Sequence, residues 1–543
     1  MYCDKDNVNI LTSLLVAHGV RHAVVCPGSR NAPIVHNLDN CETIACHPVT
    51  DERSAGFYAL GICQATDEPV AVCVTSGTAL LNLAPAVAEA MYQHQPLIAI
   101  SADRPRQWIG QLTGQTMPQA GVLAAFVKQS ADLPEPHDSE ERWYCNRLVN
   151  EALIAAMQGS RGPVHINIPI SEPLYSFSTE SLPEERVIKL SSAVSEGGAA
   201  ELLSALERAC RPIIIMGQMK LGDMPDGVIQ RLRGQHYVIM HEVLSGNEGS
   251  SAMEETIALA ERDGCLPPDV IVFVGDTLVS KRARQFLSHA RTAEAWTINA
   301  EGIVHDPFMN LRGVVQARPS DVLTAISGDG PREWSDYWER LRTAATAHRE
   351  TFSPVYSNLL AVRLLHECLS EQSGNYVMHY ANSTPIRLGC LFARSHVFCN
   401  RGINGIEGSL STAAGYSLAT AETVYCVIGD LSFFYDQNAL WNTNIRSNLR
   451  ILLLNNSGGE IFAKFDGLRQ SNARGIVMGS HNTSAEGICI ENNITYLKAH
   501  NTEELYRNIK LLTTVRAERP ILLEVFTDTY EDMRAYKEYF NTL

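Results

Sequence analysis

Two polar segments near the C-terminus have the residue types and spacing of a site for a metal-bound diphosphate. Asp430 follows one apolar run, and Asn456 and Gly458 follow the next. Neighbouring parallel strands end at the same sheet edge, so these residues would meet there. A carboxylate, an amide oxygen and a backbone carbonyl suit Mg²⁺, which keeps partners such as diphosphate. Either segment alone is more typical of a helix cap or a turn, and the combined spacing favours the metal site.

A second acidic position, Glu52, is predicted to open a helix of small residues after a turn. The Asp430 and Asn456 pattern resembles the diphosphate motif of thiamine-diphosphate enzymes. In those enzymes a Glu hydrogen-bonds to the cofactor's pyrimidine ring and so promotes removal of the thiazolium C2 proton. Without the diphosphate motif, Glu52 would be interpreted as a carboxylate that stabilises a helix N-terminus. Leu431 departs from the superfamily, most of which has Gly at that position.

Basic residues follow several predicted strands or lie in loops. The net charge is -16, which disfavours nucleic acid and anionic membranes as partners. In such a chain, arginines after strands indicate anionic small molecules, because a guanidinium holds a carboxylate with two hydrogen bonds. Any one of them alone is more often a surface ion pair. The candidates are Arg30, Arg104, Lys281, Arg282, Arg387 and Arg401.

Elements that alternate along the whole chain must position these side chains. Short apolar runs are separated by helical patterns, which is typical of parallel sheets covered on both faces. The predicted fold class is α/β, with three doubly wound parallel-sheet domains in series at 1–180, 195–330 and 355–543. The predicted strands are 22–26, 70–74, 97–100, 164–169, 212–216, 270–276, 376–378, 424–428, 451–454 and 521–525, and the predicted helices include 8–16, 79–92, 334–350 and a crossover at 438–448.

The termini and the cysteines bear on localisation. The N-terminus does not lead into the apolar core of a signal peptide, and no apolar run is long enough to span a bilayer. The 14 cysteines are scattered and lack zinc-site spacing, which is typical of reduced thiols. We therefore expect a cytoplasmic protein.

Motifs spread over nearly the whole chain resemble one family, the menaquinone-pathway synthases of 2-succinyl-5-enolpyruvyl-6-hydroxy-3-cyclohexene-1-carboxylate. Leu431, unusual in the superfamily, fits this branch. In chain order the motifs are Pro27-Gly28-Ser29-Arg30, Thr50-Asp51-Glu52-Arg53, Thr75-Ser76-Gly77-Thr78-Ala79, Ala102-Asp103-Arg104-Pro105, Ser280-Lys281-Arg282, Asn400-Arg401-Gly402, Leu410-Ser411-Thr412-Ala413-Ala414-Gly415, Gly429-Asp430-Leu431-Ser432 and Gly458-Gly459-Glu460-Ile461-Phe462.

The resemblance implies an architecture and a reaction. The N-terminal domain would bind the pyrimidine of thiamine diphosphate, and the C-terminal domain would bind its diphosphate through Mg²⁺ or Mn²⁺. The enzyme would be a transferase that decarboxylates 2-oxoglutarate and adds the succinyl-semialdehyde carbanion to isochorismate in a 1,4-addition. It would be a homodimer or a dimer of dimers, with Glu52 of one chain facing Asp430 of another.

The resemblance also implies roles for individual residues. The catalytic residues would be Glu52, Arg30 and Gln115. The metal would be held by Asp430, Asn456 and the Gly458 carbonyl, and the cofactor also by Glu52, Ile406, Leu431, Ser432 and Ile461. Substrates would meet Ser29, Arg30, Arg104, Gln115, Lys281, Arg282, Asn382, Ser383, Arg387, Arg401 and Phe462. Ile461, Phe462 and Phe465 would supply apolar wall, although core packing explains these three equally well.

Several positions depart from the family pattern, and three alternatives stay open. The departures are Gly114, Pro118, Asn404 and Glu407, which affect substrate contacts rather than cofactor chemistry. The first alternative is another thiamine-diphosphate decarboxylase or carboligase, and the second is a homologue that binds the cofactor without catalysis. The third is a nucleotide site in the middle domain, where a scaffold role is favoured because the strand end at Gly275-Asp276 is only weakly glycine-rich.

Overall fold

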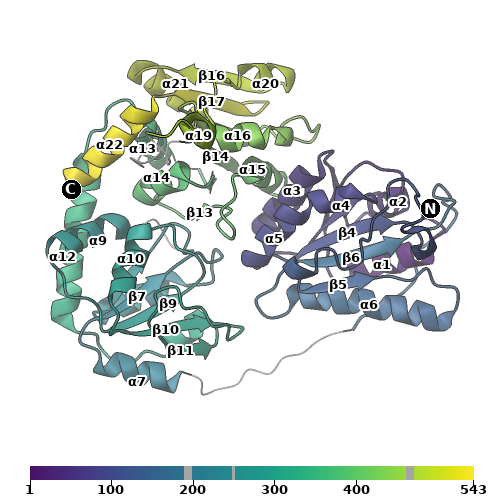
Figure 1. Ribbon diagram of the computed structural model, residues 1–543, viewed down its shortest axis with the longest axis horizontal. Helices are drawn as coiled ribbons and strands as arrows, with labels where there is room; N and C mark the ends of the chain where they lie inside the picture. The colour runs from purple at the N-terminus through teal and green to yellow at the C-terminus, as the bar shows by residue number, and fades with distance from the viewer. Residues whose placement is uncertain (189–198, 247–250, 373, 460–469) are drawn as a thin grey trace.

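Three parallel sheets follow one another along the chain, each covered by helices (Figure 1). The computed structural model describes residues 1–188, 199–246, 251–372, 374–459 and 470–543. Within these ranges, neighbouring strands of the three sheets pair in parallel. The predicted fold class is therefore confirmed, while the three domain boundaries stay predictions.

The first sheet has the strand order β2-β1-β3-β4-β6-β5. Its strands are β1 (His22–Val25), β2 (Ala45–Pro48), β3 (Val70–Val74), β4 (Leu97–Asp103), β5 (Gln129–Asp132) and β6 (Val164–Pro169). The helices are α1 (Asp6–Ala17), α2 (Ala32–Asp39), α3 (Glu52–Thr66), α4 (Thr78–Asn82), α5 (Ala84–Tyr92), η1 (Arg106–Trp108), η2 (Ala124–Phe126) and α6 (Ser139–Met157). The single helix predicted over 79–92 divides at Leu83, because Pro85 is suited to the first turn of a new helix.

The second sheet has the order β11-β10-β9-β7-β8. Its strands are β7 (Pro212–Met216), β8 (Val238–His241), β9 (Val270–Val274), β10 (Glu294–Asn299) and β11 (Leu311–Gln316). The helices are α7 (Ala200–Arg208), α8 (Asp226–Gly234), α9 (Met253–Arg262), α10 (Lys281–His289) and α11 (Pro319–Thr324). The long helix α12 (Arg332–Thr351) then leads to the third unit, close to the predicted range of 334–350.

The third sheet has the order β13-β12-β14-β15-β17-β16. Its strands are β12 (Tyr376–Tyr380), β13 (Val397–Phe398), β14 (Thr423–Gly429), β15 (Leu449–Asn455), β16 (Thr495–Ala499) and β17 (Ile521–Phe526). The helices are α13 (Asn358–Ser370), α14 (Thr384–Phe392), α15 (Ser409–Leu418), α16 (Asp430–Tyr435), η3 (Gln437–Ala439), α19 (Arg474–Met478), α20 (Glu486–Glu491), α21 (Thr502–Thr514) and α22 (Thr529–Asn541).

The crossover helix predicted over 438–448 is wrong. The helix begins directly after β14, at Asp430, and residues 440–448 form turns and irregular chain. Asparagine side chains in this segment bond to the backbone: Asn442 donates to the carbonyl of Asn438, and Asn448 donates to the carbonyl of Glu422. The Asn442 bond is local and competes with helical hydrogen bonds, and the Asn448 bond ties this segment to the chain just before β14.

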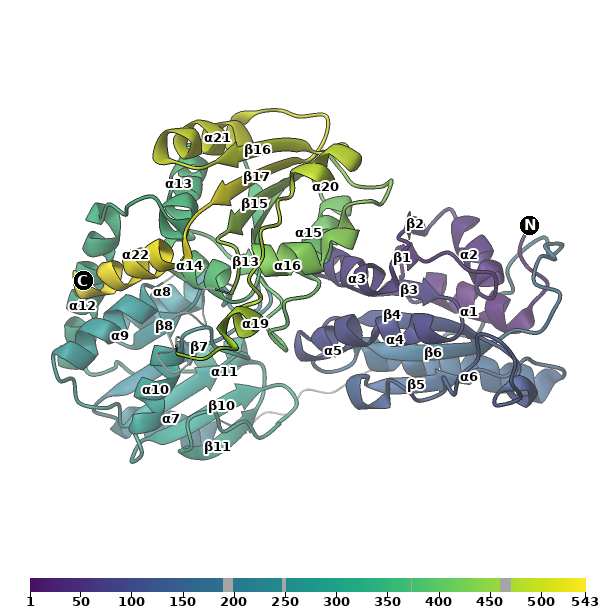
Figure 2. The same cartoon turned by 45° about the horizontal axis from the view of Figure 1, so that its top comes forward.

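The first and third units meet where α3 crosses α15, and both views show these helices side by side (Figure 2). A Cβ on Gly61 would lie 2.0 Å from the carbonyl oxygen of Thr412, and one on Gly415 would lie 2.2 Å from the carbonyl oxygen of Tyr58. The two backbones therefore touch at this crossing, and one apolar core continues through both units.

The remaining general expectations concern membranes and cysteines. No helix in the described ranges is long and apolar enough to cross a membrane. All the cysteines are free thiols, and most of them are buried or half-buried, as expected, although Cys210 is exposed.

Candidate active site

The ends of β14 and β15 lie side by side at the carboxyl edge of the third sheet, where parallel sheets bind ligands, and we call this strand-end site of Asp430, Asn456 and Gly458 the Asp430 crevice. The two strands pair in parallel with Gly429 opposite Leu454, so the residues that follow each strand lie next to each other. The backbone N–H of Gly458 donates to Asp430 Oδ2 at 2.9 Å. The structure therefore brings together the two segments that the sequence pattern predicts to meet.

Asp430 is a buried carboxylate with few positive partners. Only 4% of the residue is exposed, and Oδ1 accepts a hydrogen bond from the Leu431 N–H at 2.7 Å. His481 Nε2 lies 3.2 Å from Oδ2. Burial raises the pKa of Asp430, while the backbone N–H groups and the His481 charge oppose that change. A divalent cation would compensate this desolvated charge, so the crevice fits a metal.

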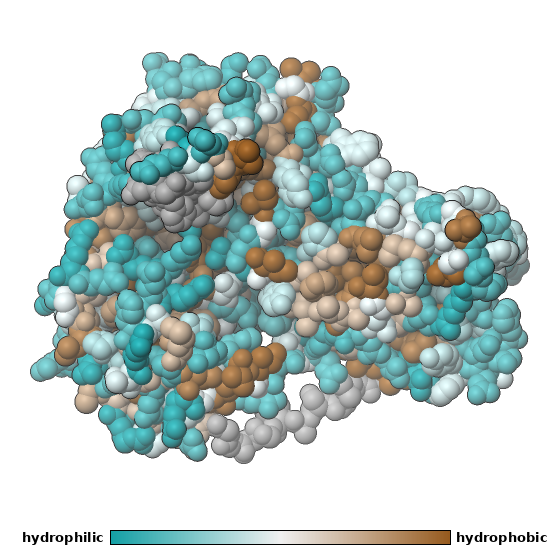
Figure 3. Space-filling model, viewed as in Figure 1, coloured by the Kyte–Doolittle hydropathy of each residue, from teal (hydrophilic) through white to brown (hydrophobic). Residues whose placement is uncertain are grey.

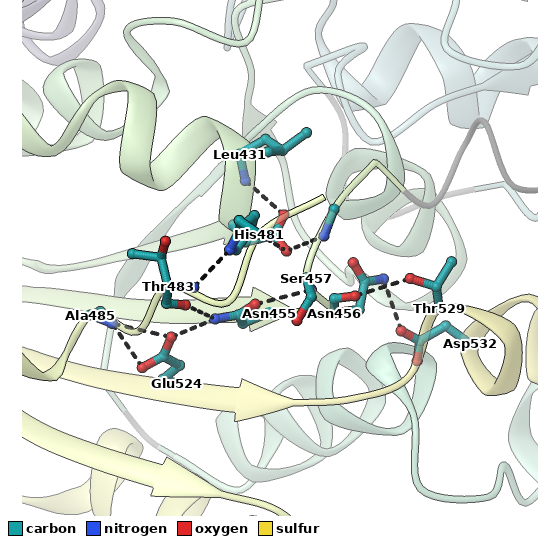
Figure 4. Close-up of polar contacts among 12 residues, drawn as sticks. Leu431, Asn455, Asn456, Ser457, His481, Thr483, Ala485, Glu524, Thr529 and Asp532 are labelled. Carbon is teal, nitrogen blue, oxygen red and sulfur yellow. Dashed lines mark hydrogen bonds and ion pairs between the residues drawn. The ribbon is translucent and has the colours of Figure 1, made fainter. Parts of the chain in front are cut away.

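Asp532 and Thr529, which the sequence analysis did not identify, hold Asn456 in place through hydrogen bonds (Figure 4). Its Nδ2 donates to Asp532 Oδ2 at 3.0 Å, and its carbonyl accepts from Thr529 Oγ1 at 3.0 Å. Burial raises the pKa of Asp532 to about 6. Both residues follow β17, which pairs with β15, so the strand-end rule applied to β17 would have found them.

These residues fit a hard cation and its diphosphate. Asp430 would supply a carboxylate oxygen, Asn456 an amide oxygen and Gly458 its carbonyl, an all-oxygen set. Gly458 has a φ of +154°, and a Cβ there would lie 3.0 Å from the carbonyl of Met478, so the turn requires glycine. Leu431 packs against Gly479, and Ser432 is buried in α16 beside Asp430.

Glu52 opens α3, as predicted. The helix is capped by Asp51, whose Oδ1 accepts from the Ser54 N–H at 3.2 Å. Glu52 Oε2 accepts from Asn82 Nδ2 at 3.3 Å. In the described part of a single chain, no hydrogen bond or ion pair joins Glu52 to Asp430.

Arg30 and Arg104 converge on one carboxylate in the first unit. Arg30 is buried and donates to the Ile170 carbonyl at 2.9 Å and to Glu172 Oε1 at 3.2 Å. Arg104 lies 4.0 Å from the same oxygen. The Glu172 side chain is 71% exposed, so this carboxylate can be displaced by an anionic ligand. Two of the predicted substrate-binding arginines are therefore neighbours.

The other candidates from the first unit line nearby loops. Ser29 is exposed and adjacent in sequence to Arg30. Gln115 is exposed, has a φ of +60° and donates from Nε2 to the Ser76 carbonyl at 3.2 Å. Gly114 has open space around it, so its departure from the family pattern costs no packing.

Asn382 and Arg401 meet in the third unit. Arg401 Nη1 donates to Asn382 Oδ1 at 3.4 Å, and its Nη2 donates to the Leu278 carbonyl of the second unit at 3.3 Å. Ser383 has a φ of +74° and precedes α14, on which Arg387 is half-buried. This part of the predicted substrate set therefore lies where the second and third units touch.

Lys281 and Arg282 begin α10 and differ in their surroundings. Lys281 is exposed. Arg282 forms ion pairs with Glu261 at 2.6 Å and Glu254 at 3.5 Å, which direct its charge toward α9. Among the described residues, no hydrogen bond or ion pair joins Arg282 to the other predicted substrate residues, so its role in substrate binding stays a prediction.

Two buried glutamates that the sequence analysis did not identify hold these loops. Glu242 accepts from the N–H groups of Val279 and Ser280 at 2.8 and 2.7 Å, and burial raises its pKa to about 7. Glu89 accepts from the N–H groups of Gly402 and Ile403, both at 2.8 Å, and burial raises its pKa as well. The sequence did contain a signal for both residues: Glu89 is a single carboxylate within an apolar helix, and Glu242 directly follows an apolar strand.

Four apolar candidates and two departures complete the set. Ile406 is 42% exposed, between Asn404, which has a φ of +71°, and Glu407. Asparagine tolerates that conformation better than most residues, which accounts for its presence. Ile461, Phe462 and Phe465 lie outside the described residues.

Comparison with known proteins defines the class first. Residues 6–124 match the family model described as "Thiamine pyrophosphate enzyme, N-terminal TPP binding domain". Together with three parallel-sheet units and the Asp430 crevice, this match identifies a thiamine-diphosphate enzyme.

Full-length relatives then identify the family. The chain is 43% identical to 2-succinyl-5-enolpyruvyl-6-hydroxy-3-cyclohexene-1-carboxylate synthase of Bacteroides thetaiotaomicron, over 100% of both chains. It is 41% identical to the synthase of the same name from Phocaeicola vulgatus, over 100% of this chain and 99% of that one. For the Porphyromonas gingivalis synthase the identity is 33%, over 99% and 97%. The chain belongs to the family of 2-succinyl-5-enolpyruvyl-6-hydroxy-3-cyclohexene-1-carboxylate synthases.

Proposed function

We propose that this chain catalyses the reaction for which its family is named. It decarboxylates 2-oxoglutarate and adds the remaining four-carbon unit to isochorismate, with thiamine diphosphate and Mg²⁺ or Mn²⁺, in menaquinone biosynthesis in the cytoplasm. The observation that carries the proposal is the buried Asp430 beside the Gly458 turn, in a chain similar over its full length to synthases of this name.

The chain's residues divide the work between cofactor and substrates. When bound, thiamine diphosphate supplies a carbon nucleophile and a store for the electron pair left by carbon dioxide. Glu52 holds a proton at the pyrimidine ring, so that the ring can act as a base. Asp430, Asn456 and the Gly458 carbonyl hold the metal. Ile406, Leu431, Ser432 and Ile461 contact the cofactor.

The substrate carboxylates are assigned to the basic residues. Arg30 and Arg104 bind a carboxylate in place of Glu172, since both guanidinium groups already face one carboxylate oxygen. Asn382, Ser383 and Arg387 meet the part derived from 2-oxoglutarate. Ser29, Gln115, Lys281, Arg282 and Arg401 complete the isochorismate side, and Phe462 supplies apolar wall.

The active unit is a homodimer, alone or as half of a tetramer, with Glu52 of one chain facing Asp430 of the other. Large apolar residues are exposed on one side of the first unit, and Figure 3 shows such residues gathered over α4 and α5. The exposed residues of these two helices include Leu81 and Tyr92, exposed by 43% and 56%. Patches of this kind mark association surfaces.

The deciding experiment supplies both substrates with thiamine diphosphate and Mg²⁺. We expect isochorismate to be consumed and carbon dioxide to be released in equal amounts, with neither change when 2-oxoglutarate is omitted. Pyruvate alone, tested in parallel, should give neither acetolactate nor aldehyde. Cofactor binding without isochorismate consumption would contradict the substrate assignment, and product formation from pyruvate alone would favour another decarboxylase.

A further inference from the structure

In the view of Figure 4, Asp532 lies on one side of Asn456, and Leu431 and His481 lie on the other. Asp532 stands at the start of α22, and 3% of the residue is exposed. Its Oδ2 accepts from Asn456 Nδ2 at 3.0 Å and from Thr527 Oγ1 at 2.7 Å. Its Oδ1 accepts from the Asn358 N–H at 2.7 Å. Both carboxylate oxygens are therefore acceptors in a buried, fixed arrangement.

The hydrogen bond to Asp532 sets the orientation of the Asn456 side-chain amide. A side-chain amide carries an oxygen on one branch and an NH₂ group on the other, and the two exchange places when the group turns over. A hard cation binds the oxygen and is repelled by the NH₂ group. Because an ionised carboxylate can only accept, Asp532 binds the nitrogen branch and directs the oxygen branch away from itself.

The adjacent asparagine provides an internal comparison. Asn455 Nδ2 donates to Oε1 of the buried Glu524 at 2.7 Å, and Asn455 Oδ1 accepts from the Ser457 N–H at 3.1 Å. Each asparagine at the end of β15 thus has its nitrogen held by a carboxylate from β17 or the residues after it. In the first pair the amide oxygen stabilises the turn, and in the second the carboxylate holds the nitrogen branch of Asn456.

We propose that Asp532 is a positioning residue for the metal site: it fixes the Asn456 amide with its oxygen toward the cation and so sets the affinity for a hard divalent metal. The inference rests on the proposed metal role of Asn456. It adds a residue that touches neither metal nor cofactor, and Thr529, which holds the Asn456 carbonyl, supports the same arrangement.

The test uses Mn²⁺ binding in the presence of thiamine diphosphate, followed by electron paramagnetic resonance, with no turnover required. Asp532→Asn keeps the size of the side chain and an acceptor for the Asn358 N–H, but it presents an NH₂ group to Asn456. The Asn456 amide then turns over and offers nitrogen to the metal. We expect about 10–100-fold weaker Mn²⁺ binding, the range for groups that orient metal ligands.

A compensating variant separates orientation from general damage. In Asp532→Asn with Asn456→Asp, the new carboxylate accepts from the new amide through one oxygen and offers the other to the metal. We expect the double variant to bind Mn²⁺ within about threefold of the parent and more tightly than either single variant. The matched control is Glu524→Gln, the same change behind Asn455, and its Mn²⁺ affinity should stay within about threefold of the parent.

The outcomes distinguish this proposal from the proposed function. Mn²⁺ binding by Asp532→Asn as tight as in the parent, or no recovery in the double variant, would overturn the positioning role. If the circular dichroism spectrum shows that Asp532→Asn is not folded, the double variant alone tests the proposal: Mn²⁺ binding within about threefold of the parent supports the positioning role, and weaker binding contradicts it. Metal binding that follows the expected pattern in an enzyme that consumes no isochorismate would support the role of Asp532 and remove the substrate assignment.

Discussion

The Asp430 crevice and the predicted arginine set are assembled in different ways. The crevice is formed by the ends of neighbouring strands in one sheet, and its described contacts come from the third unit. The arginine set is distributed over three units, and Arg401 of the third unit donates to the Leu278 carbonyl of the second unit. One site is thus fixed by a single sheet, whereas the other depends on how separate units dock.

The two regions also differ in electrostatics. Asp430 is a buried carboxylate that lies 3.2 Å from the His481 ring, and a divalent metal would compensate its desolvated charge. Two of the arginines are already paired with carboxylates, Arg30 with Glu172 and Arg282 with Glu261. A substrate must therefore exchange with internal partners, and we expect changes there to affect substrate affinity more than cofactor affinity.

The largest effect is expected from Asp430→Ala. Removing the carboxylate removes the charge that holds the metal, which supplies several kcal/mol, so turnover should fall by at least about 10⁴-fold. Calorimetric titration with thiamine diphosphate and Mg²⁺ should show no binding in the range where the parent saturates. Binding as tight as the parent's would break the assignment of this crevice, provided that circular dichroism shows both proteins folded.

Glu52→Gln should act on chemistry rather than on assembly. A Gln cannot exchange the proton with the pyrimidine ring, and a positioned acid–base group contributes about 10²–10⁴-fold. The turnover number should fall by that factor while cofactor affinity changes little. Glu68→Gln, an exposed position just beyond the same helix, is the control and should retain full activity. An unchanged turnover number for Glu52→Gln would contradict the mechanism.

Arg104→Ala should separate the two regions. Loss of a charge-assisted hydrogen bond costs about 1.5–3 kcal/mol, so KM for isochorismate should rise by about 10–100-fold. Cofactor affinity measured by calorimetry should not change. Arg106→Ala, in the same loop, is the control, since Arg106 pairs with Asp132 and is exposed. If Arg104→Ala weakened cofactor binding as well, the two regions would not be independent.

The smallest effect is expected from Glu242→Gln, which should change how the stability of the protein depends on pH. Because Glu242 has a pKa of about 7, above the usual 4.5, its stabilising contribution is complete below pH 4.5 and lost as pH rises through 7. The loss is at most about 3 kcal/mol. Glu242→Gln does not titrate, so its melting temperature relative to the parent should increase by a few degrees between about pH 5 and 8. The control is Glu503→Gln at an exposed position, whose melting temperature relative to the parent should not depend on pH. If the melting temperature of Glu242→Gln relative to the parent were also independent of pH, the Glu242 carboxyl would titrate normally and the prediction would be wrong.

The sequence predicted the features that depend on local pattern and on neighbouring strands. Apolar runs predicted the strands, and the strand-end rule predicted that Asp430 would lie beside the turn that contains Gly458. The predicted crossover helix did not form. The Asn442 side chain bonds to nearby backbone carbonyls there, a competition that apolar periodicity does not register.

Partners that come from distant parts of the chain could not be predicted. Glu172 lies 142 residues from Arg30 in sequence, and Asp532 lies 76 residues from Asn456. No short-range spacing links such pairs, and only the docking of strands and units brings them together. The roles of Glu89 and Glu242 were missed for the same reason, since each holds the backbone of a loop from elsewhere in the chain.

The crossing of α3 and α15 has a consequence for recombining members of this family. There is no room for a side chain at Gly61 or Gly415, so each helix can pack only against a partner helix that also has glycine at the crossing. A chimera that takes its first unit from one relative and its third unit from another must therefore inherit both glycines. A relative that has replaced one of them would supply an incompatible half, however similar its catalytic residues.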